Sequence, residues 1–196
     1  MNRRHFTAAL LTAITLVSGF ALTATGPSPA MAITLPQGSD PANTLVLTLK
    51  DGQVLIRLRP DLAPNHVAQI KALVKSGFYD GIVFHRVING FMAQTGDPTG
   101  TGAGGSKLPD LKAEFTNTHF GRGVLGMART SNPNSANSQF FIMFADAPHL
   151  DGQYTVFGEV VSGMEFVDRI KKGDTSDGMV VGPDKIIKLQ LASDAK

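Results

Sequence analysis

Hydrophobic and polar residues alternate along two adjacent stretches of the chain. Leucine fills every second position of residues 44–50, and Val, Ile and Leu fill every second position of residues 53–59. This period of two residues is typical of strands that bury one face. Asp51 and Gly52 lie between the stretches, and an Asp-Gly pair in that setting favours a two-residue turn. The pattern therefore predicts a β-hairpin.

Two other stretches have a helical period. Pro64 suits a first helical turn, four apolar residues then share one face, and Gly77 ends the pattern. The four apolar residues are Val67, Ile70, Leu73 and Val74. A second helix is expected over residues 164–172, where two lysines in the last turn suit the negative end of the helix dipole. Either helix can cover one end of a sheet.

Short apolar runs fill the rest of the chain and are separated by Gly, Pro, Asn and Asp. They span residues 82–88, 123–127, 140–144, 156–161 and 185–191. With the hairpin, they predict a mainly β domain with two helices. A closed barrel is the natural arrangement, because closure hides strand edges that would otherwise be exposed.

The first residues have the pattern of an export signal. Arg3 and Arg4 precede an apolar stretch over residues 8–22, which is short for a membrane span, and no charge follows before Asp40. A small-x-small cleavage pattern, Ala-Met-Ala, ends at residue 32. We therefore predict a signal peptide over residues 1–32 and one domain over residues 33–196.

The predicted signal implies a bacterial periplasmic location, and its route is open. The opening NRRHF is similar to a twin-arginine signal, which carries folded proteins, but any export signal needs positive charge at this place. An uncleaved anchor, or secretion beyond the periplasm, is the alternative.

Charge and cysteine content exclude several classes of function. The formal net charge is +2, from 18 basic and 16 acidic residues, and removal of Arg3 and Arg4 makes the predicted mature chain neutral. A neutral chain without a basic cluster is not typical of proteins that bind nucleic acid or anionic membranes. The chain contains no cysteine, which excludes disulfides, thiolate metal sites and a cysteine nucleophile. The histidines are scattered, so we expect no metal.

Four ordered blocks carry a family resemblance. They are FHRVINGFMAQTGDPTGTGAGG at residues 84–105, HFGRGVLGMAR at 119–129, NSANSQFFI at 134–142 and LDGQYTVFGEVVSGMEFVDRI at 150–170. These blocks resemble the cyclophilin-type peptidyl-prolyl cis-trans isomerases, and the resemblance covers nearly all of the predicted mature chain. It implies an eight-stranded antiparallel β-barrel closed on itself and capped by two helices. It also implies an enzyme without a cofactor that rotates X-Pro bonds.

Such a reaction needs little covalent chemistry, because rotation requires only that the partial double bond of the amide be weakened. A permanently charged, forked donor beside an apolar pocket suits this task, since it stabilises the twisted amide without proton transfer. By its match to the family motif within FHRVI, Arg86 is the expected catalytic residue.

The resemblance also implies a set of substrate-binding residues. Apolar side chains are expected to hold the proline ring, and these are Phe91, Met92, Phe141 and Leu150. Gln94 and Gln139 are expected to hold substrate backbone, because an amide side chain is both donor and acceptor. Ala128 and Arg129 match the strand along which the peptide lies.

Three matched positions depart from common family residues. Arg129 stands where many relatives have Asn, and could alter the preference for residues next to proline. His149 stands where many eukaryotic relatives have Trp, which supports cyclosporin binding, so we expect weakened cyclosporin affinity with activity retained. Tyr154 stands where they have His, and its ring can still wall the proline pocket.

Three other functions have some support in the sequence. The glycine-rich stretch at residues 96–106 resembles a phosphate cradle, but no Lys-Ser/Thr pair ends it, which favours a flexible surface loop. A hydrolase triad of Ser138, His149 and Asp151 lacks the G-x-S-x-G elbow. A non-catalytic or chaperone-like module that holds proline-containing segments is the main alternative to an isomerase. The expected partners are proline-containing segments of folding proteins, and we expect a monomer.

Overall fold

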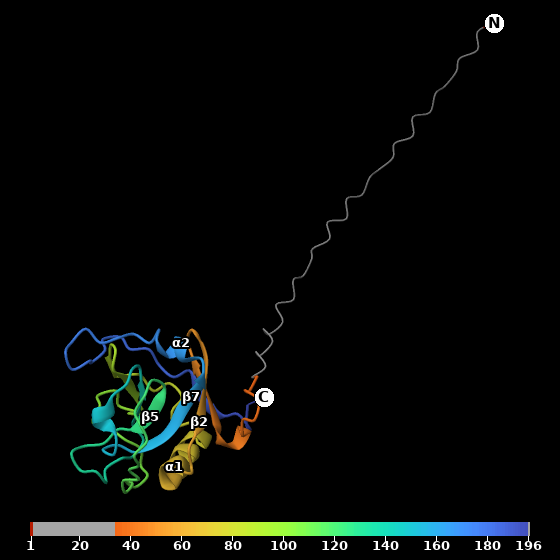
Figure 1. The fold of residues 1–196 in the computed structure, drawn as a ribbon. Coiled ribbons are helices and arrows are strands. Elements are labelled where there is room, and N and C mark those ends of the chain that lie inside the picture. Colours follow the sequence, from red (N-terminus) through yellow and green to blue (C-terminus); the bar gives the residue numbers. More distant parts are fainter. Residues whose placement is uncertain (2–33, 196) are drawn as a thin grey trace. The chain divides into compact units, whose positions relative to one another are not determined.

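Eight antiparallel strands form one curled sheet (Figure 1). The structure, a computed structural model, describes Met1 and residues 34–195, so all but the first residue of the signal predicted over residues 1–32 lies outside the described residues. The strands are β1 Thr44–Leu49, β2 Gly52–Leu58, β3 Arg86–Ile88, β4 Met92–Thr95, β5 Val124–Met127, β6 Phe140–Met143, β7 Val156–Ser162 and β8 Lys188–Leu191. Their order in the sheet is β3-β4-β6-β5-β7-β2-β1-β8. The mainly β prediction is confirmed.

The predicted hairpin is formed by β1 and β2. Leu49 pairs with Gly52, so the two turn residues are Lys50 and Asp51, one position earlier than expected. On its other side β1 pairs with β8, and Leu45 lies opposite Leu191. The first and last strands of the chain are therefore neighbours in the sheet.

The prediction of a closed barrel is wrong, because β3 and β8 end the sheet without a ladder between them. The run expected over residues 82–88 becomes a strand only from Arg86, and the run over residues 185–191 only from Lys188. Between these edges lie two isolated bridges, Val83–Lys185 and Arg86–Met179. Residues 82–85 and 185–187, which would have to pair to close a barrel, are joined by a single bridge and form no ladder. The sheet is therefore a curled half-barrel.

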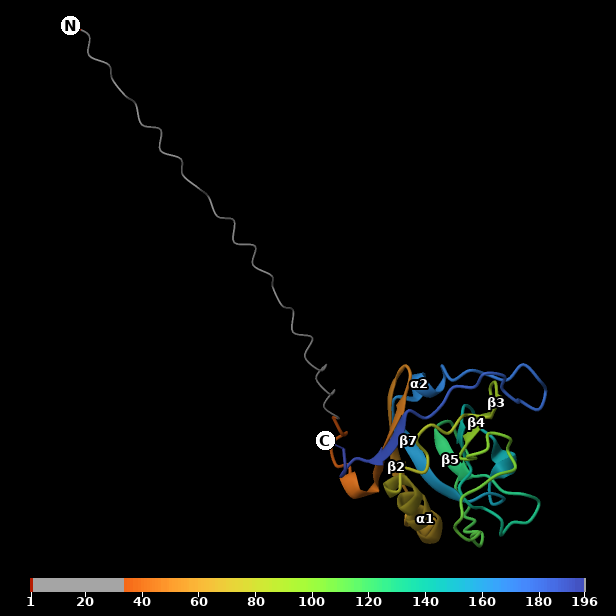
Figure 2. The same ribbon diagram turned by 180° about the vertical axis from the view of Figure 1, so that it is seen from behind.

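Two helices cover opposite ends of the curled sheet, α1 Pro64–Lys75 and α2 Met164–Val167 (Figures 1 and 2). Short 3₁₀ helices occur at Pro41–Asn43 and Pro148–Leu150. α1 has the predicted limits, but α2 is shorter than residues 164–172. After Val167 the backbone bonds tighten to three-residue spacing, as in Ile170 N–H to Val167 C=O at 3.1 Å, and the helix ends. Among the described residues no helix is long and apolar enough to cross a membrane.

The start of α1 is capped by a distant residue. Ala63 precedes the helix and offers no side-chain acceptor. Glu114 accepts instead from the backbone N–H groups of Asn65 (3.2 Å) and His66 (3.1 Å), and lies 2.6 Å from His66 Nδ1. A carboxylate at this position satisfies free N–H groups and suits the positive end of the helix dipole.

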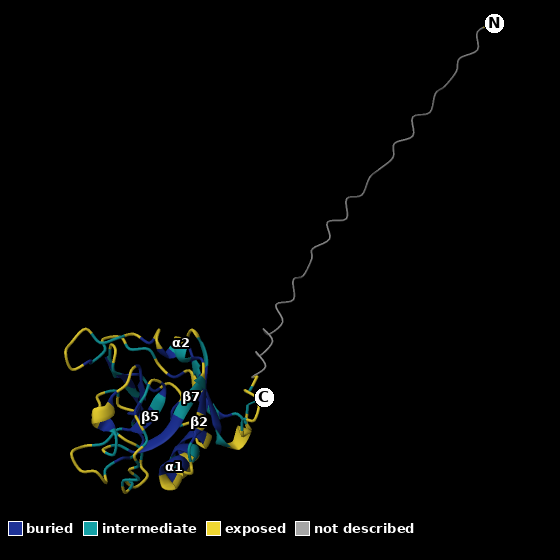
Figure 3. Cartoon of the chain, in the orientation of Figure 1, coloured by how far each residue is buried: buried dark blue, intermediate teal, exposed yellow. Residues whose placement is uncertain are grey.

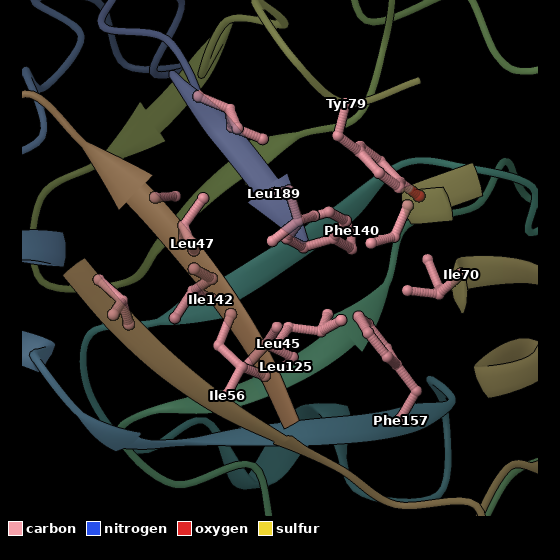
Figure 4. Close-up of a cluster of buried hydrophobic side chains, with 14 of the residues drawn as sticks. Leu45, Leu47, Ile56, Ile70, Tyr79, Leu125, Phe140, Ile142, Phe157 and Leu189 are labelled. Carbon is pink, nitrogen blue, oxygen red and sulfur yellow. The ribbon is translucent and has the colours of Figure 1, made fainter. Parts of the chain in front are cut away.

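Strands β4, β6 and β5 are covered on both faces. Their inner face packs into the main core. Core residues shown in Figure 4 are Leu45, Leu47, Ile56, Ile70, Tyr79, Leu125, Phe140, Ile142, Phe157 and Leu189. The outer face carries a smaller buried cluster of Met92, Phe120, Phe141, Met143, Ala147, Leu150 and Val156. Buried residues follow the strands while exposed residues follow the connecting loops (Figure 3). Three members of this smaller cluster, Met92, Phe141 and Leu150, line the candidate site.

Candidate active site

One pocket of about 320 Å³ gathers ten of the eleven predicted site residues. It is lined by Arg86, Phe91, Met92, Gln94, Ala128, Arg129, Phe141, His149, Leu150 and Tyr154. The eleventh, Gln139, lines an adjoining pocket of about 370 Å³, which shares Gln94, Ala128 and Arg129 with the first. Residues that are up to 68 positions apart in the sequence, such as Arg86 and Tyr154, therefore meet at one place.

The sheet register places the main residues in one row across four strands. Arg86 lies opposite Gln94, Gln94 opposite Phe141, and Phe141 opposite Gly126. Directly opposed residues of antiparallel strands share a face, so these side chains stand on the outer face. Gly126 leaves room for aromatic rings, because a Cβ there would lie 2.4 Å from Phe141 Cζ and 2.6 Å from Phe120 Cε1.

A polar relay runs beside this row. Arg86 Nη1 donates to Gln94 Oε1 at 3.2 Å, Gln94 Nε2 to Gln139 Oε1 at 2.9 Å, and Gln139 Nε2 to the carbonyls of Gly102 and Gly104 at 2.9 and 2.8 Å. The relay orients both amides. It leaves several N–H groups of the Arg86 guanidinium without an acceptor among the described residues, at the rim of the pocket.

Aromatic rings form the walls of the pocket above its buried floor. Met92, Phe141 and Leu150 are 2%, 6% and 8% exposed, so they form the floor. The Tyr154 ring stands edge-on to Phe141, with centroids 5.8 Å apart. The Phe91 ring stacks on the His149 ring, with centroids 5.9 Å apart. The result is an apolar pocket with a cation at its rim.

Arg129 is held against the pocket wall. Its guanidinium lies 4.5 Å from the ring centroid of Tyr154. It also donates to the carbonyl of Gln153 at 3.0 Å and to the carbonyl of Thr130 at 2.8 Å. Stacking of a guanidinium on an aromatic face is attractive, so Arg129 fixes the position of the Tyr154 ring.

The glycine-rich stretch at residues 96–106 is folded around a carboxylate of its own. Asp97 is 1% exposed and accepts from the backbone N–H groups of Thr99 (2.8 Å), Thr101 (3.0 Å) and Gly102 (2.6 Å). Burial alone would raise the pKa of Asp97, but these hydrogen bonds outweigh it and lower the pKa to about 2. The backbone N–H groups that a phosphate would need already donate to the Asp97 carboxylate, which argues against a phosphate cradle.

The residues of the hydrolase triad are not linked to one another. Ser138 Oγ is buried and donates to the carbonyl of Gly96 at 2.8 Å. Asp151 accepts from Phe120 N–H at 2.8 Å and lies 2.9 Å from His119 Nδ1, so its partner is a different histidine from His149. Within residues 34–195 no group of three or more metal-ligating side chains is placed to hold an ion.

The His119–Asp151 pair predicts a pH dependence. The hydrogen bond to Asp151, and a weaker effect of Asp146, raise the pKa of His119 above 6.5, and the same bond lowers the pKa of Asp151 below 3.8. Stability from His119 is therefore present below pH 6.5 and is lost as the pH rises through its raised pKa. Stability from Asp151 is present above pH 3.8 and is lost as the pH falls through its lowered pKa.

We expect Asp151→Asn to lower the pKa of His119, as followed by NMR titration of its ring. Asp146→Asn is the matched control, and its effect should be smaller because Asp146 is 3.8 Å from His119 Nε2. If the pKa of His119 is unchanged in Asp151→Asn, the hydrogen bond to Asp151 is not what raises it.

Sequence reasoning missed two neighbours of Arg86. Asp177 accepts from Arg86 Nε through its backbone carbonyl at 2.8 Å, and no local pattern could reveal a contact over 91 positions. His85 is 1% exposed, and both its ring nitrogens lack a partner among the described residues. Burial lowers the pKa of His85, which keeps the ring neutral beside Arg86. The only sequence signal for His85 was its place beside Arg86.

Known proteins were compared with this chain. Residues 44–191 match the family model described as "Cyclophilin type peptidyl-prolyl cis-trans isomerase/CLD". A "Probable peptidyl-prolyl cis-trans isomerase" of Brucella suis is 58% identical over 177 residues, which cover 84% of this chain and 90% of that protein. A peptidyl-prolyl cis-trans isomerase of Schizosaccharomyces pombe is 44% identical over 143 residues, covering 70% of this chain and 91% of that protein.

Two solved structures share the fold. A cyclophilin from Hirschia baltica matches with a TM-score of 0.72 at 29% identity, covering 80% of this chain and 76% of that one. A cyclophilin type peptidyl-prolyl cis-trans isomerase of Cryptosporidium parvum, crystallised in the presence of the dipeptide Ala-Pro, matches with a TM-score of 0.69 at 30% identity, covering 76% of this chain and 98% of that one. Sequence and structure agree that the chain belongs to the cyclophilin-type peptidyl-prolyl cis-trans isomerases.

Proposed function

We propose that this cyclophilin-type peptidyl-prolyl cis-trans isomerase binds the proline ring of an X-Pro segment in the pocket of Phe91, Met92, Phe141, Leu150 and Tyr154. Arg86 then stabilises the twisted amide. The observation that carries the proposal is a guanidinium with free donors at the rim of a pocket whose apolar floor is buried. Beside such an apolar floor a charged donor acts more strongly than in bulk solvent.

The proposed chemistry needs no proton transfer. In the planar ground state the nitrogen lone pair is shared with the carbonyl, and twisting localises it. A donor that favours the twisted arrangement over both planar isomers lowers the barrier in each direction. Arg86 is suited to this role because it stays charged at any physiological pH and offers a planar fork of N–H groups.

The polar residues beside the pocket are assigned to the substrate backbone. Gln94 and Gln139 are already oriented by the relay, and Ala128 and Arg129 lie where an extended peptide would pass. Because Arg129 is engaged with carbonyl groups and with Tyr154, we assign it to support of the pocket wall. Its effect on flanking-residue preference then arises through the position of Tyr154.

Exchange NMR on an Ala-Pro peptide with residues 33–196 tests this function. Uncatalysed exchange takes tens to hundreds of seconds, so acceleration is readily detected without a coupled protease. Isomerase activity predicts faster exchange at substoichiometric protein. If peptide resonances shift while the exchange rate stays at its uncatalysed value, the chain is a binding module and the proposal is wrong.

We further propose that the enzyme assists folding of exported proteins in the bacterial periplasm, as a monomer that acts on proline-containing segments. The support is the export pattern of residues 1–32. The test is to express the full chain in a bacterium and to measure its mature N-terminus by mass spectrometry in the periplasmic fraction, where Ile33 is expected. Arg3→Lys with Arg4→Lys distinguishes the routes, because loss of export indicates the twin-arginine route and retained export the general one. An uncleaved chain in the membrane fraction contradicts the proposal.

Cyclosporin affinity gives a prediction for His149. This side chain is exposed and stacks on Phe91, and it stands where many eukaryotic relatives have Trp. We expect His149→Trp to bind cyclosporin at least about tenfold more tightly than the unchanged chain, since a larger ring adds apolar contact area. Titration calorimetry measures this, and peptide exchange should stay within a few-fold. Equal cyclosporin affinity in both proteins would show that position 149 is not the determinant.

A further inference from the structure

The segment between α2 and β8 lies along the free edge of β3. Gly173 N–H donates to the carbonyl of Val87 at 2.9 Å, and Val87 N–H donates to the carbonyl of Gly178 at 2.7 Å. One step further, Val180 N–H donates to the carbonyl of His85 at 3.0 Å. Residues 173–180, here called the Arg86 brace, therefore follow the short strand that carries Arg86.

The brace also contacts the Arg86 side chain. The carbonyl of Asp177 accepts from Arg86 Nε at 2.8 Å, while Gln94 Oε1 accepts from Nη1 on another side of the guanidinium at 3.2 Å. Two acceptors at different N–H groups fix both the position and the rotation of a planar fork. The remaining donors are then directed by the protein before substrate arrives.

The acceptor on the brace is neutral. The Asp177 carboxylate is folded back on its own loop, where it accepts from Thr175 Oγ1 and Met179 N–H. None of the ion pairs within residues 34–195 includes Arg86. The hydrogen bond from Thr175 lowers the pKa of Asp177, which keeps the carboxylate ionised, and the same bond together with that from Met179 N–H holds it toward the loop. A carbonyl orients the guanidinium without an ion pair that would compete with a twisted amide for its donors.

Two glycines allow this close approach. Gly178 has φ +79°, and a Cβ there would lie 2.4 Å from Ile88 Cγ1 and 3.2 Å from the carbonyl carbon of Val87. At Gly173 a Cβ would lie 2.3 Å from the carbonyl oxygen of Gly178. A side chain at position 178 would push the brace away from β3 and move the Asp177 carbonyl from Arg86, whereas one at position 173 would force apart the two ends of the brace itself.

We propose that the Arg86 brace is a positioning element of the isomerase, which holds the Arg86 guanidinium in its working orientation through the Asp177 carbonyl. The inference rests on the proposed role of Arg86. A preoriented donor stabilises the twisted amide without reorganising during the reaction, so the brace acts on the maximal rate rather than on peptide affinity.

Gly178→Ala tests the brace, and Gly182→Ala is its matched control. Gly182 also has a positive φ, +62°, but a Cβ there meets nothing nearer than Lys171 Nζ at 3.6 Å. Both variants therefore introduce the same kind of backbone strain, while only the first displaces the brace. In the otherwise unchanged chain, we expect Gly178→Ala to lower the exchange rate at saturating Ala-Pro peptide roughly tenfold, with the peptide Kd within twofold. Gly182→Ala should leave both unchanged.

The Arg86 Nε–H resonance reports the contact directly. In the unchanged chain this proton should exchange slowly with water, because it is bonded to the Asp177 carbonyl, and Gly178→Ala should make its exchange fast. Fast exchange in the unchanged chain overturns the brace, even if Gly178→Ala fails to fold. A full maximal rate in folded Gly178→Ala after loss of this protection also overturns it. Absence of any catalysis by the unchanged chain is instead a failure of the proposed function, and leaves the Nε–H result readable.

Discussion

Arg86→Ala is expected to lower the rate of X-Pro exchange at least a hundredfold while peptide affinity stays within a few-fold. Loss of one preorganised donor to a developing charge costs about 10²–10³ in rate, or about 2.7–4 kcal/mol of barrier. The apolar floor of Met92, Phe141 and Leu150 does not depend on Arg86, so the proline ring should still bind. Exchange NMR gives the rate, and peptide titration gives the Kd.

Two further variants make the Arg86 result specific. Arg86→Lys keeps the charge but loses the fork, and it should recover only part of the rate because a lysine cannot bond Asp177 and Gln94 while also facing the substrate. Arg57→Ala is the control for lost surface charge, since Arg57 is exposed and paired with Glu159 at 2.7 Å outside the pocket. A similar loss in Arg57→Ala, or full activity in Arg86→Ala, contradicts the assigned role.

Phe140→Ala is expected to remove about 3–5 kcal/mol of stability, whereas Phe141→Ala should mainly remove peptide affinity. The two rings are adjacent in β6 and point to opposite faces. Phe140 packs inside the curled sheet against Tyr79 and Phe157, with centroids 5.6 and 5.8 Å away. Phe141 lines the pocket, so its truncation opens space beside bound proline.

Urea unfolding and peptide titration separate these effects. The midpoint should fall furthest in Phe140→Ala, and the folded fraction of that variant should bind peptide within a few-fold of the unchanged chain. Phe141→Ala should bind at least about tenfold more weakly and lose less stability, since its ring lies in the pocket floor and in the smaller cluster rather than within the main core. Equal stability losses together with equal affinities would show that the two faces of β6 are not distinct in function.

Local periodicity predicts the elements whose apolar residues recur at a regular spacing. The β1–β2 hairpin and α1 followed from alternation and from a helical spacing bounded by Pro64 and Gly77. β4 could not be found in this way, because Met92–Thr95 is short and has a polar residue on each face, and it is a strand only through its pairing with β3 and β6. Closure of the sheet was likewise beyond local pattern, since it depends on where distant edges stop.

The set of residues that line the pocket is predicted by the motif resemblance and not by periodicity. Nothing near Phe141 in the sequence indicates that its ring would meet Tyr154, or that Gly126 would leave room for it. The Arg86 brace was missed for the same reason. Its contact with Arg86 uses a backbone carbonyl, which every residue has, so residue identity carries no signal apart from the two glycines.

Pairing of β1 with β8 bears on when this protein can fold during its own synthesis. β8 is the last of the eight strands to leave the ribosome, and until it arrives β1 has an unpaired edge. Glu114 must also be made before the start of α1 can be capped. Such long-range closure favours folding after the chain is complete, and exposes the nascent N-terminal hairpin to other chains meanwhile. A chain that ends before β8 is therefore expected to be an aggregation-prone fragment, and the newly made isomerase is expected to reach its folded state only when its final strand is in place.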